Sequence, residues 1–129
     1  MNFGNSSSLF VVLVAACQSA SAAGQYTALE ALSKQLAIEK SKPEGSKSAA
    51  KCPNAIAEFE GLSRHEIHKS LGGPDTFKLK TISSPKISEA TYFIAPKALQ
   101  GARGGGHPEV TFYFNDSERV LRAACTLAR

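Results

Sequence analysis

Two histidines and a glutamate stand close together near the middle of the chain, at His65, Glu66 and His68. Zinc hydrolases of the H-E-x-x-H type carry two His side chains four residues apart on one helix, with the Glu as general base. Lys69 occupies the position of the second His here. Histidines three residues apart can still share a helix face and bind zinc with an acidic third ligand. We favour a solvent-facing polar surface, because Glu66 also fits a helix-capping box.

A glycine-rich segment, residues 102–107, contains Arg103 and ends in His107. It lacks the Lys-Ser/Thr pair and the strand-to-helix context of a phosphate-binding loop. We interpret it as a connection between two strands. Because binding contacts concentrate in loops, Arg103 and His107 are candidate partner-binding residues.

The apolar run Leu9–Ala16 is the first strong signal of localisation. Eight residues cannot span a bilayer, which takes about twenty, so the run is typical of the apolar region of a secretory signal. Val14-Ala15-Ala16-Cys17 resembles the bacterial lipobox, which makes Cys17 a candidate lipidation site, while Ala20-Ser21-Ala22 offers an ordinary cleavage site. Residues 1–22 are predicted to be a signal segment of an exported protein. The sequence does not decide between cleavage before Cys17 and cleavage after Ala22.

Cys52 and Cys125 remain once Cys17 is lipidated or removed. An even pair in an oxidising compartment predicts a disulfide, and two buried free thiols are the alternative. A nucleophilic Cys-His pair would need a third orienting group, and none is recognisable. We therefore expect neither an enzyme nor a cofactor.

The charged residues argue against a nucleic-acid partner. Lys and Arg exceed Asp and Glu by 15 to 11, giving a net charge of +4. They are scattered from Lys34 to Arg129, whereas nucleic-acid readers concentrate basic residues in a patch. A solvated surface is the simpler interpretation.

The helices and strands that must position these residues are predicted from the periodicity of apolar residues along the chain. Thr27 and Glu30 have capping-box spacing ahead of leucines at helical intervals, predicting a helix over 28–40. Residues 41–51 are rich in Pro, Gly, Ser and Lys, which is typical of a linker. The chain is thus divided into residues 1–22, an N-terminal helix and flexible linker over 23–51, and a folded domain over 52–129.

Two short helices and four strands are predicted in that domain. The second helix, 64–71, has Ser63 as its N-cap, Glu66 completing a capping box, and Gly72 and Pro74 ending it. Alternation and β-branched or aromatic residues predict strands, the last of which turns Cys125 inward. The fold class is α+β, with two short helices packed on a small antiparallel β-sheet. The remaining predicted elements are a helix beginning at Pro53 and ending at Gly61, and strands over 77–82, 91–94, 110–114 and 121–127.

Residues 59–75 resemble the hallmark segment of the SmpA/OmlA, or BamE-like, envelope lipoproteins. That family has a Gly-x-Ser/Thr-x-x-x-Val/Ile-x-x-x-Leu-Gly-x-Pro helix ahead of an antiparallel sheet, and Val110–Asp116 with Val120-Leu121 resembles its closing hairpin. The resemblance covers about residues 52–125. The same architecture, duplicated, is seen in β-lactamase inhibitory proteins, so the fold implies binding rather than one function. The matching motif residues are Gly61, Ser63, Ile67, Leu71, Gly72 and Pro74.

The resemblance implies a non-enzymatic accessory protein that supports outer-membrane protein assembly or envelope integrity through contacts with envelope proteins. It would lie at the periplasmic face of the outer membrane, held by a lipid on Cys17. The alternative is a soluble periplasmic or secreted inhibitor of the same fold. The expected partner-binding residues are Tyr92, Thr111 and Tyr113, taken as exposed sheet positions, with Arg103 and His107 in the loop.

Overall fold

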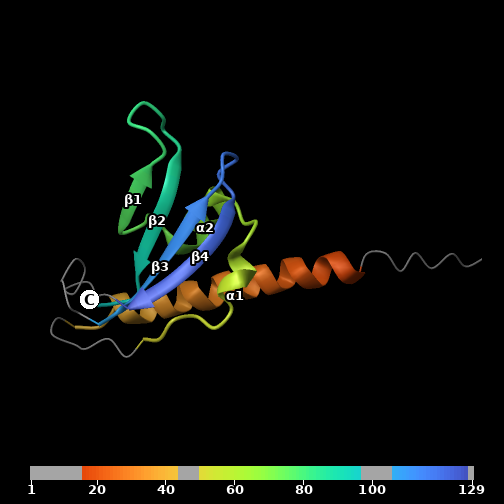
Figure 1. Cartoon of the computed structure of the whole chain (residues 1–129). Helices are drawn as coiled ribbons and strands as arrows, with labels where there is room; N and C mark the ends of the chain where they lie inside the picture. Colours follow the sequence, from red (N-terminus) through yellow and green to blue (C-terminus); the bar gives the residue numbers. More distant parts are fainter. Residues whose placement is uncertain (1–15, 44–49, 97–105, 128–129) are drawn as a thin grey trace, which may run out of the picture.

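A computed structural model describes residues 16–43, 50–96 and 106–127, with only the backbone described for residues 16–25 (Figure 1). Two α-helices, a 3-10 turn and a four-stranded antiparallel sheet make up the described chain, so the predicted α+β class is confirmed. The elements are α1 (Ala16–Lys40), η1 (Ile56–Phe59), α2 (Arg64–Leu71), β1 (Thr76–Leu79), β2 (Ile87–Phe93), β3 (Pro108–Phe114) and β4 (Val120–Leu127).

Helix α2 begins at the predicted capping box. The Glu66 amide donates to Oγ of Ser63 over 3.1 Å, and the Ser63 amide donates to Oε2 of Glu66 over 2.8 Å. These bonds satisfy donors that the start of a helix leaves without partners. Leu62 and Ile67, on either side of the cap, are buried together in the core. Gly72 then ends the helix at φ +79°, a backbone conformation that strains any residue with a side chain.

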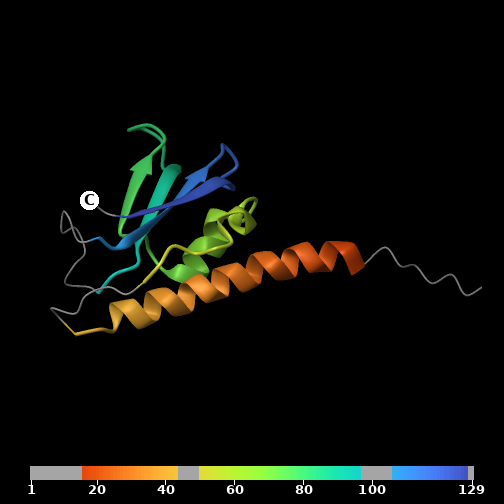
Figure 2. The same ribbon diagram turned by 60° about the horizontal axis from the view of Figure 1, so that its bottom comes forward.

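The four strands pair in chain order, β1-β2-β3-β4, each antiparallel to the next. Ala90, Phe112 and Ala123 lie opposite one another across β2, β3 and β4 and face the helices. Because neighbouring side chains on a strand point to opposite faces, Tyr113 and Arg122 face away from the helices. Figure 2 shows α2 and η1 against one face of the sheet, with α1 running beneath them.

The core lies between that sheet face and the helices. The Phe112 ring packs in T-shaped contacts with the rings of Phe59 and Tyr92, with ring centroids 5.3 and 5.8 Å away. Three leucines of α1 join the same cluster, and each is at most 4% exposed. The core therefore extends beyond the boundary predicted near Cys52, because α1 packs into the same core as the sheet. The leucines are Leu29, Leu32 and Leu36.

Helix α1 is longer than predicted. The sequence indicated residues 28–40, and the helix begins at Ala16. The added residues 16–27 contain several alanines, the residue with the highest helix propensity. Residues 44–49 of the predicted linker lie outside the described residues.

Other predicted elements differ in detail. The strand predicted over 77–82 ends at Leu79, and the one predicted over 91–94 begins at Ile87. The stretch between Pro53 and Gly61 forms the 3-10 turn η1 instead of an α-helix, and its start lacks the side-chain cap that α2 has.

In the pairing of β3 with β4, Tyr113 lies opposite Arg122 but Phe114 lies opposite Val120, so the register shifts by one residue. Leu121 falls in this irregularity and is 63% exposed instead of facing the core. Cys125 packs against the core, as the alternation predicts.

The two edges of the sheet differ. Beside β4, the Gly61 amide donates to the Val120 carbonyl and the Val120 amide donates to the Leu62 carbonyl, over 2.8 and 2.7 Å. These bonds cover the start of β4. Across the described residues, β1 has no neighbouring segment on its outer side, and all four of its residues are exposed.

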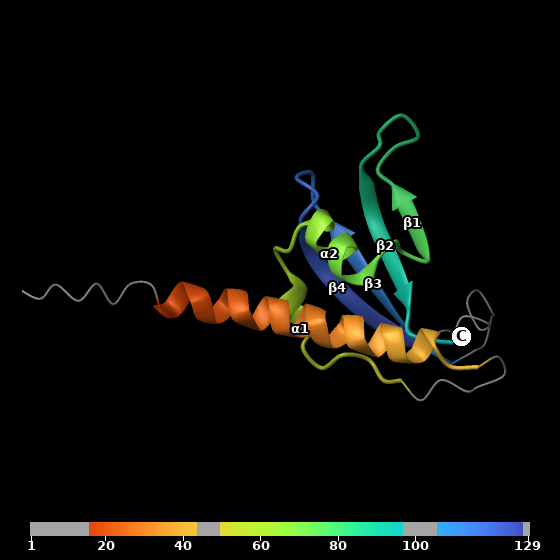
Figure 3. The same cartoon turned by 180° about the vertical axis from the view of Figure 1, so that it is seen from behind.

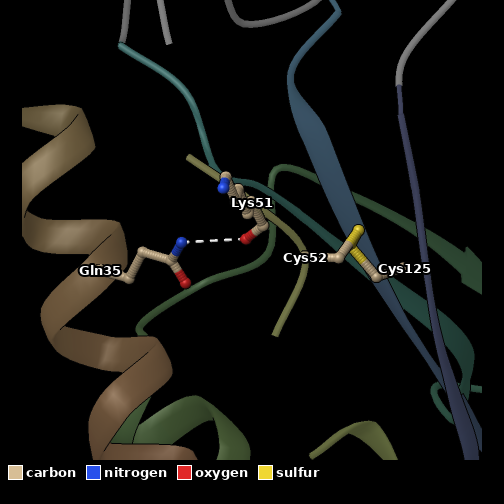
Figure 4. Close-up of a disulfide and its surroundings, with 4 residues drawn as sticks. All are labelled: Gln35, Lys51, Cys52 and Cys125. Atoms are coloured by element: carbon tan, nitrogen blue, oxygen red, sulfur yellow. Dashed lines mark hydrogen bonds between the residues drawn. A yellow bond between two sulfur atoms is a disulfide. The ribbon is translucent and has the colours of Figure 1, made fainter. Parts of the chain in front are cut away.

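A disulfide joins Cys52 to Cys125 on β4, the pair predicted from the sequence (Figure 4). It closes a sequence separation of 73 residues. Next to it, Nε2 of Gln35 donates to the Lys51 carbonyl over 3.0 Å, which ties α1 to the segment that carries Cys52. The N-terminal helix, the segment before η1 and the last strand are therefore joined at one place.

Candidate functional site

The sheet face turned away from the helices is the candidate site. In Figure 1 the sheet lies in front of α2, and in Figure 3, from behind, both helices lie in front of the sheet. No helix or strand within the described ranges covers the front face. The strand register places polar and charged side chains in two cross-strand rows there. One row is Thr76, Thr91, Thr111 and Ala124, and the next is Lys78, Glu89, Tyr113 and Arg122.

Tyr113 and Arg122 form a cation–π contact on this face. The Arg122 guanidinium carbon lies 3.9 Å from the centroid of the Tyr113 ring. A cation over an aromatic face is attracted by the ring quadrupole, which holds both side chains in place. Beside them, the hydroxyls of Thr91 and Thr111 are hydrogen-bonded over 2.9 Å. Tyrosine and arginine are enriched at protein interfaces, so this pair has the chemistry of a binding anchor.

The exposure predicted for Tyr92 is wrong. Tyr92 is 1% exposed, and its hydroxyl donates to the Gly72 carbonyl over 2.9 Å. Pairing with Val110 on β3 places it on the face that the helices cover. Burial, with a smaller contribution from Asp75, raises the pKa of Tyr92 to about 12. Tyr92 is a core residue that fixes the end of α2 against β2.

The exposure implied for His107 is also wrong. The side chain is 1% exposed and packs edge-on against the Phe93 ring, with centroids 5.6 Å apart. It directly precedes β3, so the sheet rather than the loop determines its position. Arg103 lies outside the described residues. Of the five predicted partner-binding residues, Thr111 and Tyr113 lie on the open sheet face.

The histidine pair lies elsewhere. His65 and His68 are exposed on α2 and line a surface cavity of about 440 Å³ with Ser63, Arg64, Ser117 and Glu118. In the part of the chain that the structure describes, no group of three His, Cys, Asp or Glu side chains is placed to hold a metal ion. Glu66 is held in the capping box. Glu118, the acidic residue that lines the cavity, pairs with Arg64, so neither carboxylate is placed as a third ligand beside the two histidines.

Glu118, at the rim of this cavity, has an unusual backbone. Its φ is +56°, in the left-handed region that favours glycine. Two contacts to α2 hold it there: its carboxylate pairs with Nε of Arg64, and its carbonyl accepts from the Arg64 amide over 2.8 Å. The turn between β3 and β4 is thereby fixed against the start of α2.

The capping box makes stability depend on pH. The hydrogen bond from the Ser63 amide, supported by one from the Tyr26 hydroxyl, holds the pKa of Glu66 below its ordinary value. The stabilisation is therefore fully present above the carboxyl pKa of about 4.3 in the unfolded chain. It is lost as the pH falls through the lower pKa of the folded state.

We expect urea unfolding at a series of pH values to show this loss in the wild type. Glu66→Gln is the matched control, because glutamine also completes a capping box and does not titrate. Below pH ~4.3 the wild type should lose more stability than the variant. Equal losses in the two proteins would contradict a role for the Glu66 carboxylate.

Cys17 falls in the first turn of α1, where only the backbone is described. Residues 1–15, with most of the apolar run, lie outside the described residues. Within the described ranges, none of the helices combines the length and the apolar character that crossing a bilayer requires. Lipidation at Cys17 stays a prediction.

Comparisons with known proteins supply no relative. No family model matches the chain, and neither a curated protein nor a solved structure does. Function is therefore inferred from the sequence pattern and the geometry of this chain.

Proposed function

We propose that this chain is a non-enzymatic accessory protein of a bacterial envelope that binds a protein partner on the open face of its sheet. The observation that carries the proposal is the Tyr113–Arg122 pair, 3.9 Å apart on a face without a covering element in the described chain. The helices are packed on the other face and bury its apolar side chains. A sheet face bearing an aromatic anchor, threonine hydroxyls and paired charges is suited to contact another protein.

A BamE-like fold is part of the proposal. It is supported by the residues of the α2 segment: the capping serine, the buried Ile67, and Gly72 followed by Pro74. The closing β3–β4 hairpin supports it as well: the family that the sequence resembles usually has a glycine at this turn, and Glu118 takes the left-handed conformation that glycine favours. The order of elements, a helix followed by an antiparallel meander, agrees with the same architecture.

Location in the envelope is supported by the cysteines. Disulfides persist in oxidising compartments and are rare in the cytosol, so the Cys52–Cys125 pair favours export. The lipobox-like Val14-Ala15-Ala16-Cys17 favours attachment to the membrane. The proposal gives His65 and His68 no catalytic part.

Site-specific photo-crosslinking in the native envelope tests the partner surface. A photoreactive residue at Thr111, on the open face, should give a discrete adduct with the partner. The same group at Lys34, exposed on α1, is the matched control and should give none. Adding Tyr113→Ala should weaken the adduct, since removing an anchor costs about 1–2 kcal/mol of binding free energy. Adducts at Lys34 without any at Thr111 would refute the proposal.

The mass of the mature N-terminus separates the accessory protein from the inhibitor. A diacylglyceryl group on Cys17, lost in Cys17→Ala, is expected for the accessory protein. A chain beginning at Ala23 without lipid would favour the soluble inhibitor that uses the same sheet face.

A further inference from the structure

The hairpin formed by β1, β2 and the turn between them exposes large apolar side chains. Ile82, in the turn, is fully exposed, and Phe77 and Leu79 on β1 are 56% and 45% exposed. The register places Phe77 opposite Ala90, at the margin of the core face, but none of the described helices reaches over it to cover the ring. Burying three such side chains would be strongly favourable, and folding leaves them in water.

The same hairpin carries a net positive charge. Residues 76–93 contain Lys78, Lys80 and Lys86 against one acidic residue, Glu89, a net charge of +2 in a chain whose total is +4. Lys78 pairs with Glu89, and Lys80 pairs with Asp116, but the lysine side chains are 75% and 44% exposed. Ion pairs this exposed contribute little, so the ammonium groups are free to exchange partners.

The shape of the hairpin limits what can cover it. Its turn extends past the end of the sheet, beyond the neighbouring strands (Figures 1 and 3). Ile82 stands at this projecting end, so the apolar surface is convex. A second copy of the chain would present the same lysines, and like charges brought together at a contact repel each other. A convex apolar tip surrounded by lysines fits a surface that is deformable and negatively charged.

We propose that the β1–β2 hairpin docks on an anionic lipid surface, with Ile82 entering the interface and Lys78, Lys80 and Lys86 meeting the headgroups. Apolar side chains at a membrane surface bury in the boundary between headgroups and acyl chains. Each lysine close to an anionic leaflet strengthens binding by about fivefold. The docking needs neither a lipid on Cys17 nor the partner on the open sheet face.

A tryptophan at the tip tests insertion directly, because the chain has no tryptophan of its own. The purified full-length Ile82→Trp protein is mixed with vesicles of phosphatidylcholine, alone or with phosphatidylserine. Its emission should shift to the blue and be quenched by brominated lipid with the anionic vesicles only. Ile38→Trp, on α1 at a site 61% exposed, is the matched control and should show neither change.

Co-sedimentation with the anionic vesicles measures binding and separates the contribution of the apolar tip from that of the lysines. Ile82→Ser should weaken binding at least about tenfold, since a large apolar side chain is lost from the interface. Replacing the three lysines by glutamine should weaken it about fivefold for each lysine, and added salt should do the same to the wild type. Leu127→Ser, 60% exposed at the far end of the sheet, should bind as the wild type does.

Two outcomes would overturn the inference. Every variant carries the same N-terminus, so binding that survives both Ile82→Ser and the lysine substitutions would belong to the apolar residues 9–16. Binding lost with the lysines but without a blue shift at Ile82→Trp would mean attraction without insertion, as expected for an acidic protein partner. Circular dichroism verifies that each variant is folded.

Discussion

Reduction of the Cys52–Cys125 disulfide is expected to lower the free energy of unfolding by about 4 kcal/mol. In the chain-entropy model, the bond removes conformational freedom from the unfolded chain in proportion to the logarithm of the loop it closes. Here the loop spans a sequence separation of 73 residues. Domains of this size are stable by about 5–15 kcal/mol, so the loss would be a large part of the total.

Urea unfolding with and without reductant measures the change, together with the mass of the intact protein. Oxidised protein should weigh two hydrogens less than reduced protein. The double variant Cys52→Ser with Cys125→Ser should unfold like the reduced wild type and be insensitive to reductant. Two thiols that alkylate freely in native, unreduced protein would contradict the bond.

Leu32→Ala should destabilise the protein by about 2–5 kcal/mol, the usual cost of truncating a buried leucine. Leu32 is 1% exposed and packs in the core although it lies on the N-terminal helix α1. The matched control is Ile38→Ala on the same helix, where the side chain is 61% exposed. That change should stay within about 0.5 kcal/mol.

The measurement is the urea midpoint of the two variants against the wild type. A large effect at Leu32 alone would establish that α1 and the sheet unfold as one unit. Small and equal effects in both variants would mean that α1 is dispensable for the fold and acts as a separate arm.

The local signals in the sequence predicted structure well. The capping box of Ser63 and Glu66, with Gly72 and Pro74 after it, placed α2 to the residue, because these interactions occur within one turn of the chain. The alternation Val110, Phe112, Phe114 placed β3 and its end, although the strand begins two residues earlier, at Pro108. Cys125 faced inward and met Cys52.

The wrong predictions concern side chains whose burial is determined by contacts with residues distant in the sequence. An aromatic strand residue such as Tyr92 can face either side, and its burial depends on pairing with Val110 and on α2. The burial of His107 depends on contact with Phe93, which the sequence does not reveal. The candidate site had the same limit: Arg122 was not among the predicted residues, because only the β3–β4 register brings it over Tyr113.

The cysteine arrangement also restricts when the chain can mature. Three cysteines allow three different single bridges, and the fold uses only the one between Cys52 and Cys125. Cys125 lies in the last strand, so Cys52 cannot form this bond until nearly all the described chain has been synthesised and exported. Acylation or removal of Cys17 before that moment would leave Cys52 with a single possible partner. A free Cys17 thiol would instead compete for it, so early processing of the N-terminus would act as quality control on the pairing.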